Sequence, residues 1–145
     1  MELIKNYSQS KLDKSNSSTN ADIKLYKEDN LICLYGEFQL NYDLYNKKRN
    51  ITFIHEFKIN LNSGDIDTYY EIKNNDLTTN KLYRNTIIKK KNDFSRVLES
   101  IENGFIKGEK RKKFWGVKYE RAIEDIFITL HEILKENFST QFYKS

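Results

Sequence analysis

Apolar and polar residues alternate along positions 51–61. One set of alternate positions is apolar except for a single histidine: Ile51, Phe53, His55, Phe57, Ile59 and Leu61. A period of two residues sustained over eleven positions is typical of a β-strand. The polar run 62–65 follows at once, and its Gly64 suits the positive φ that tight hairpin turns require. Because the alternation resumes over 66–72, the pattern predicts a β-hairpin across residues 51–72.

Further strands are expected from shorter apolar segments, with polar segments connecting them. The strands cover 23–27, 31–42 and 81–91, and the connections cover 28–30, 46–50 and 74–80. Residues 1–20 are polar and end in a run of serine, asparagine and threonine. Such a segment buries too little apolar surface to offset the entropy lost on ordering. We therefore expect residues 1–20 to be a flexible N-terminal arm.

The apolar period changes from two to about 3.6 near residue 92, which predicts helices. Asn92 or Asp93 can cap a short helix that we expect Gly104 to end. A long helix is predicted at 117–138 from one apolar stripe: Tyr119, Ile123, Ile126, Phe127, Leu130, Ile133, Leu134 and Phe138. Strands followed by helices indicate an α+β fold. We expect one domain over 21–145, an antiparallel sheet covered by a short and a long C-terminal helix.

Composition narrows the class of protein. The 145 residues are 38% hydrophobic and 32% charged, which excludes a wholly disordered chain and suffices for one core. Cys33 is the only cysteine, so neither an intrachain disulfide nor a cysteine-based zinc site can form. No apolar run has the length of a signal peptide or a membrane span. We expect a cytoplasmic protein with no membrane partner.

Candidate reactive groups do not form a recognisable catalytic motif. His55 and His131 each precede a glutamate but lack the second histidine of a metalloprotease motif. Cys33 lies in an apolar run, where a cysteine is usually a small buried hydrophobe.

One set of carboxylates remains as an alternative. Asp65, Asp67, Glu71 and Lys73 include the Glu-x-Lys spacing of metal-dependent nucleases, in which carboxylates hold Mg²⁺. The chain contains two such spacings, about the number that chance predicts. We therefore assign no catalytic residue, no metal and no cofactor.

Charge is segregated along the chain. Windows 81–91 and 107–118 contain 11 of the 25 basic residues and one of the 21 acidic residues. The second window also contains Trp115, the only tryptophan, and leads into the predicted long helix, whose N-terminus favours anions. Basic and aromatic side chains together are typical of single-stranded nucleic-acid sites. The expected binding residues are Lys89, Lys90, Lys91, Lys107, Lys110, Arg111, Lys112, Lys113, Trp115 and Lys118.

A second interpretation of these windows stays open. Phe114 and Trp115 can instead anchor the loop in the core while the lysines are merely solvated.

The runs Phe57–Asp65 and Gly108–Tyr119, with a basic segment between them, resemble part of the PcfJ-like proteins of conjugative plasmids and crAss-like phages. The resemblance covers about residues 51–140. It implies a mobile-element or phage setting, with the host cytoplasm or a virion as the location if a phage encodes the protein, and it transfers no catalytic residue.

These observations lead to one expectation and two alternatives. We expect a non-enzymatic accessory protein of a phage or plasmid that contacts DNA or RNA through a basic surface, without strong sequence preference. The first alternative is a structural or interaction subunit of a phage or conjugation complex, whose basic surface meets a protein partner. The second is the metal-dependent nuclease.

Overall fold

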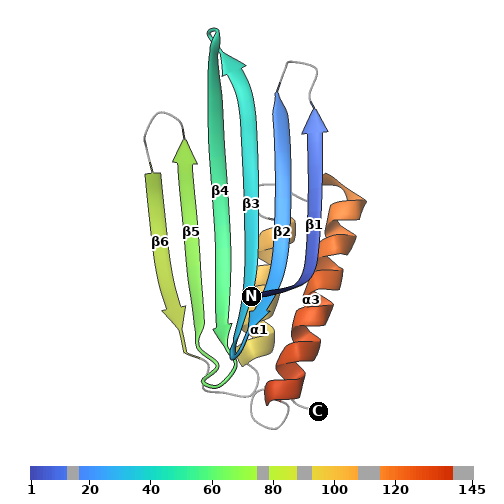
Figure 1. Cartoon of the computed structure of the whole chain (residues 1–145). Coiled ribbons are helices and arrows are strands. Elements are labelled where there is room, and N and C mark those ends of the chain that lie inside the picture. The colour runs from blue at the N-terminus through green and yellow to red at the C-terminus, as the bar shows by residue number, and fades with distance from the viewer. Residues whose placement is uncertain (13–16, 75–78, 88–92, 108–114, 139–145) are drawn as a thin grey trace. The chain divides into compact units, whose positions relative to one another are not determined.

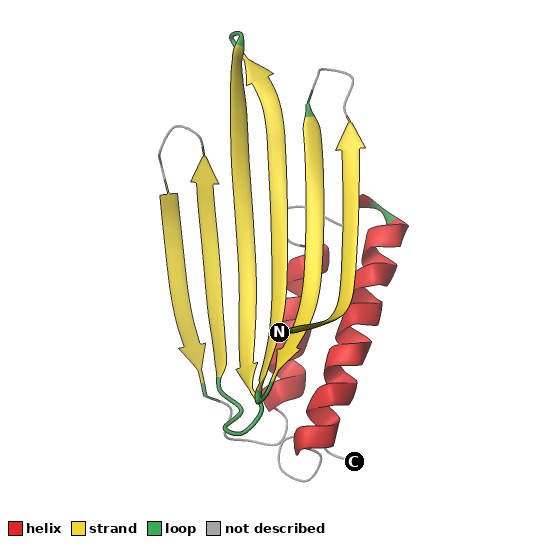
Figure 2. Ribbon diagram, in the orientation of Figure 1, coloured by secondary structure: helices red, strands yellow, loops and turns green. Residues whose placement is uncertain are grey.

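The computed structural model describes residues 1–12, 17–74, 79–87, 93–107 and 115–138 (Figures 1 and 2). The chain divides into two compact units. One unit, Met1–Ile59 with Ile66–Thr86, contains the strands. The other, Asn60–Asp65 with Ile87–Ser145, contains the described helices.

The strand unit is a six-stranded antiparallel sheet in which every strand lies beside its neighbours in the sequence (Figure 1). The strands are β1 (Glu2–Leu12), β2 (Ser18–Glu28), β3 (Leu31–Leu44), β4 (Lys47–Asn60), β5 (Ile66–Asn74) and β6 (Thr79–Thr86). Short connections suffice for this order because consecutive antiparallel strands need only hairpin turns. β1 and β6 are consequently the edge strands of the described sheet.

The predicted hairpin of residues 51–72 is confirmed. β4 and β5 pair from Ile51↔Asn74 to Ile59↔Ile66. Gly64 has a φ of +80°, and its N–H donates to the Asn60 carbonyl over 2.8 Å. The side-chain oxygen of Asn60 also accepts the Asn62 and Ser63 N–H groups, so the loop satisfies its own backbone donors.

The loop expected at 46–50 is shorter than predicted. The β3–β4 turn consists of Tyr45 and Asn46, both with positive φ, and β4 already begins at Lys47. Two central residues with positive φ match a type I′ turn, whose backbone twist agrees with that of the strands it connects. The polar run 47–50 suggested a loop, yet exposed strand positions accept polar side chains equally well.

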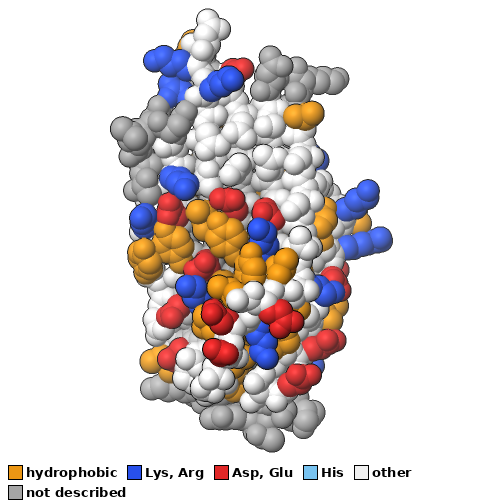
Figure 3. Space-filling model, viewed as in Figure 1, with side chains coloured by type: hydrophobic (Ala, Val, Ile, Leu, Met, Phe, Trp, Pro, Cys, Tyr) orange, Lys and Arg blue, Asp and Glu red, His pale blue; other side chains and the backbone are white. Residues whose placement is uncertain are grey.

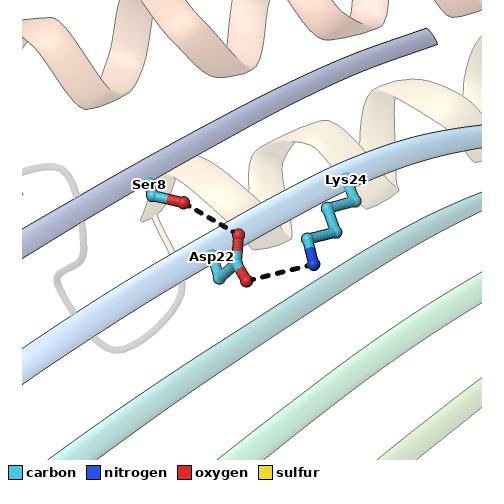
Figure 4. Close-up of polar contacts among 3 residues, drawn as sticks. All are labelled: Ser8, Asp22 and Lys24. Carbon is cyan, nitrogen blue, oxygen red and sulfur yellow. Dashed lines mark hydrogen bonds and ion pairs between the residues drawn. The ribbon is translucent and has the colours of Figure 1, made fainter. Parts of the chain in front are cut away.

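The arm expected at residues 1–20 is wrong for residues 2–12 and 18–20, which belong to β1 and β2. The two strands pair from Glu2↔Lys27 to Leu12↔Ser18, with a register shift between Leu3 and Lys5. A polar contact joins the two strands: the Ser8 hydroxyl donates to Asp22 over 2.9 Å, and within β2 Asp22 also lies 3.5 Å from Lys24 Nζ (Figure 4). The apolar pattern gave no signal because backbone and polar contacts stabilise this strand.

The helical unit consists of α1 (Asp93–Lys107) and α3 (Val117–Phe138). The bounds of α3 agree with the predicted long helix, and seven of its eight stripe residues are buried. The phenyl rings of Phe105 and Phe127 lie 6.1 Å apart. The Tyr119 hydroxyl donates to the Phe105 carbonyl over 2.6 Å. An aromatic contact and a buried hydrogen bond therefore join the two helices.

Gly104 does not end α1, contrary to the prediction. The helix continues through it to Lys107. Phe105 and Ile106 are 1% and 7% exposed, and Phe105 extends the buried row of Leu98 and Ile101 at helical spacing. Burial of these side chains outweighs the poor helix propensity of one glycine.

The fold class is confirmed as α+β, with a six-stranded antiparallel sheet followed by a shorter and a longer helix. That the helices cover one face of the sheet, and that residues 21–145 behave as one domain, stay predictions.

Removing residues 1–12 should destabilise the protein. Tyr7 pairs with Ile23, which is fully buried, so deletion uncovers that part of β2. We expect the free energy of unfolding in urea to fall by at least about 2 kcal/mol, the value of one buried apolar side chain. An arm outside the fold would be removed without changing the urea midpoint.

Two glycine-to-alanine variants should change stability in opposite directions. A Cβ at Gly104 meets nothing within 4 Å, so Gly104→Ala should stabilise α1 by about 0.5–1 kcal/mol. Gly116 has a φ of +88°, and its carbonyl accepts the Glu120 N–H at the start of α3. Gly116→Ala should cost about 1–2 kcal/mol. Thermal unfolding of both variants measures the contrast, and equal effects would contradict it.

Glu102 of α1 should make the protein more stable to unfolding at acidic pH than at neutral pH. Burial, then the carboxylates of Glu124 and Glu99, raises the pKa of Glu102. A raised folded-state pKa gives stability that is present below the unfolded pKa and is lost as pH rises through the folded pKa. Glu102→Gln should therefore unfold at higher urea than the parent at pH 7, and the gap should close near about pH 4. A gap that is constant with pH would exclude this cause.

Candidate nucleic-acid interface

Most of the binding residues expected from the sequence lie outside the described residues. These are Lys89, Lys90, Lys91, Lys110, Arg111, Lys112 and Lys113. Lys107 is the last residue of α1, and its side chain is not described. Trp115 and Lys118 are described, and the exposed Lys118 lies in the first turn of α3.

Trp115 occupies the core. Its side chain is 4% exposed, and its ring lies 6.1 Å from that of Tyr119, which is fully buried. A ring in this position has no open face on which a base can stack. The geometry supports the second interpretation of Trp115, as an anchor at the start of α3.

The described part of the first basic window, residues 81–87, lies in strand β6 except for Ile87. Lys81 and Arg84 are exposed, and the strand contains no carboxylate. Between them, Tyr83 is 72% exposed. β6 therefore presents two cations and one aromatic ring at an edge of the described sheet.

The register of β4, β5 and β6 builds three rows of side chains across one sheet face. The rows are Ile54–Glu71–Lys81, Glu56–Tyr69–Tyr83 and Lys58–Asp67–Asn85. Alternate residues of a strand share a face, so the rows lie side by side. Figure 3 shows a band of hydrophobic side chains across the middle of the sheet face in view, with basic and acidic side chains among them.

Contacts within and between the rows hold the tyrosine rings and the carboxylates in position. The Tyr69 and Tyr83 rings lie 4.8 Å apart at a 47° tilt, and the Tyr69 hydroxyl donates to Glu71. The side-chain amide of Asn85 donates to Asp67, and Lys58 Nζ lies 3.4 Å from Glu56. The rows therefore form an ordered polar surface around two tyrosine rings.

Titratable groups near the rows are held in their neutral forms. Burial, and then the Glu56 carboxylate, raises the pKa of the Cys33 thiol to about 11. Burial, and then Glu37, raises the pKa of Tyr35 to about 12. The hydrogen bond to Glu71 raises the pKa of Tyr69 as well. At neutral pH these groups are protonated donors, whereas nucleophilic chemistry needs the thiolate or phenolate.

The nuclease alternative gains no support from the carboxylates of β5. Asp67 and Glu71 lie on one face but four residues apart, roughly 13 Å along a strand. Asp67 accepts from Asn85 and Glu71 accepts from Tyr69. In the described part of the chain, no three histidine, cysteine or acidic residues are grouped as metal ligands.

The two histidine side chains pack against neighbouring residues. The His55 ring meets Tyr70 edge to face at 4.5 Å and lies 6.5 Å from Phe38. His131 is half-buried on α3, and burial, followed by Lys135, lowers its pKa. Both histidines therefore lie in packed environments, in the core or at its boundary.

Sequence reasoning missed Glu56, Tyr69, Tyr83 and Asn85. Tyr83 lies inside the first basic window, so an aromatic residue between Lys81 and Arg84 was an available signal. Tyr69 and Glu56 lie beside Tyr83 only because of how β4, β5 and β6 pair, and this pairing is known from the structure.

Among the described helices, none is long and apolar enough to cross a membrane. No protein-family model, curated protein or solved structure matches the chain.

Proposed function

We propose that the protein binds single-stranded nucleic acid, without catalysing a reaction, through β6 and the basic windows that include and follow it. The observation that carries the proposal is β6 itself: an exposed tyrosine flanked by two exposed cations on a strand without a carboxylate. Cations bind phosphates, and an exposed aromatic ring stacks with any unpaired base.

The basic windows extend this surface in the sequence. Lys89, Lys90 and Lys91 follow β6 after two isoleucines, and Lys110, Arg111, Lys112 and Lys113 precede α3. If the many lysines reflected only a codon bias of the genome, they would be spread evenly along the chain. Instead, these two windows contain eleven basic residues and one acidic residue. The phage or plasmid setting enters the proposal only through the resemblance of residues 51–140.

A protein partner is the second candidate. β6 is an edge strand, and Leu82 and Ile87 are 63% and 57% exposed. Unpaired backbone groups and apolar side chains on an edge strand can pair with a strand of another chain. A complex that survives nuclease treatment in gel filtration would favour this candidate.

The salt dependence of binding tests the nucleic-acid proposal. If about four phosphates are engaged, the slope of log K against log salt should be near −3 on a single strand. Raising salt from about 50 to 200 mM should then weaken binding about 50-fold. Fluorescence anisotropy of a labelled oligonucleotide measures this slope.

Charge-removal variants locate the contacts. Replacing Lys81 and Arg84 with glutamine should reduce the slope by about 1.4, and replacing Lys110, Arg111, Lys112 and Lys113 should flatten it further. The matched control replaces four exposed lysines outside the windows, Lys11, Lys47, Lys48 and Lys73, and should leave the slope nearly unchanged. Salt-insensitive binding, or equal effects of control and test variants, would contradict the proposal.

A further inference from the structure

An open hollow of about 500 Å³ lies over the last three strands. Two of the side-chain rows line it, Glu56–Tyr69–Tyr83 and Lys58–Asp67–Asn85, and the lining also includes Thr68 and Arg84, which pair with each other across β5 and β6. A volume of this size accommodates one flat heterocycle with its substituents.

The tyrosine pair offers a stacking platform. Tyr83 is 72% exposed, while Tyr69 lies 4.8 Å away and is tethered through its hydroxyl to Glu71, which is 9% exposed. The tether orders Tyr69, and Tyr69 in turn supports the ring of Tyr83. A supported, exposed ring loses little freedom when a base stacks on it.

The carboxylates beside the rings select for hydrogen-bond donors. Asp67 accepts the Asn85 amide at one oxygen, and because each carboxylate oxygen has two lone pairs, both oxygens can accept a further donor. Glu56, on the neighbouring row, is likewise an acceptor only. Among the bases, guanine presents two adjacent donors, N1–H and the N2 amino group, which match one carboxylate.

The charges of the hollow and of β6 suit different parts of a nucleotide. In the lining, Lys58 Nζ lies 3.4 Å from Glu56, while the Asp67 carboxylate can still accept donors from an uncharged ring. Lys81 and Arg84 belong to β6, a strand without a carboxylate, and suit the phosphates attached to that ring. Base and backbone of one nucleotide are thereby accommodated by adjacent surfaces.

We propose that this hollow binds one unpaired guanine of a single strand, stacked on Tyr83 with its N1 and N2 donors on Asp67. The inference rests on the proposed function and adds a base preference at one position.

Nonamer oligonucleotides test the inference by fluorescence anisotropy at fixed salt. A thymine nonamer is compared with the same nonamer carrying one central guanine, adenine or hypoxanthine, and with a uracil ribonucleotide nonamer carrying one guanine. The central guanine should tighten binding about tenfold over thymine or adenine. Hypoxanthine, which lacks the N2 amino group, should recover only part of the gain. The DNA and RNA series show whether the sugar matters.

Three variants separate stacking from base selection. Tyr83→Leu should weaken binding of the guanine nonamer about tenfold, whereas Tyr83→Phe should not. Asp67→Asn preserves shape and should abolish the preference for guanine without weakening the thymine nonamer. Tyr45→Leu is the matched control, because Tyr45 is an 89% exposed tyrosine in the β3–β4 turn. It should leave both affinities unchanged.

The outcomes distinguish this inference from the proposed function. Absence of salt-sensitive binding to every nonamer overturns both. Salt-sensitive binding that is equal for all central bases, or unaffected by Tyr83→Leu and Asp67→Asn, overturns the guanine site alone.

Discussion

The register of β4, β5 and β6 is the constraint on which the candidate site depends. Glu56, Tyr69 and Tyr83 meet because each is directly opposite the next across two ladders. A slip of one residue in either ladder would turn the side chains of a whole strand to the other face. The Asn60–Asp65 turn opposes such a slip between β4 and β5, since Gly64 supplies the positive φ and Asn60 accepts the loop N–H groups.

Tyrosine is well suited to the site because it tolerates both burial and water. The Tyr69 hydroxyl satisfies a carboxylate that is 9% exposed, and its ring supports Tyr83 at the surface. A buried carboxylate without a donor would be costly, so the hydrogen bond and the ring contact stabilise each other's geometry. The same hydrogen bond raises the pKa of Tyr69 and keeps it a neutral donor.

The sequence predicted those elements whose apolar pattern is strong. The stripe from Tyr119 to Phe138 located α3, and alternation around Gly64 located the β4–β5 hairpin. It failed for β1, where Ser8 and Asp22 replace apolar contacts, and at Gly104, where Phe105 continues the buried stripe. The candidate site could not be predicted, because Glu56, Tyr69 and Tyr83 are brought together by pairing between strands and not by local spacing.

The base contacts and the phosphate contacts that we propose should respond differently to salt. The phosphate contacts proposed for β6 and the basic windows would depend on counterion release, so salt should weaken them, and they would not distinguish bases. The proposed stacking on Tyr83 and hydrogen bonds to Asp67 would involve an uncharged base, so salt should affect them far less. Total affinity and base preference should therefore respond differently to ionic strength. As salt rises the protein should bind more weakly, yet the ratio of affinities for different bases should persist, because it arises from a separate set of atoms.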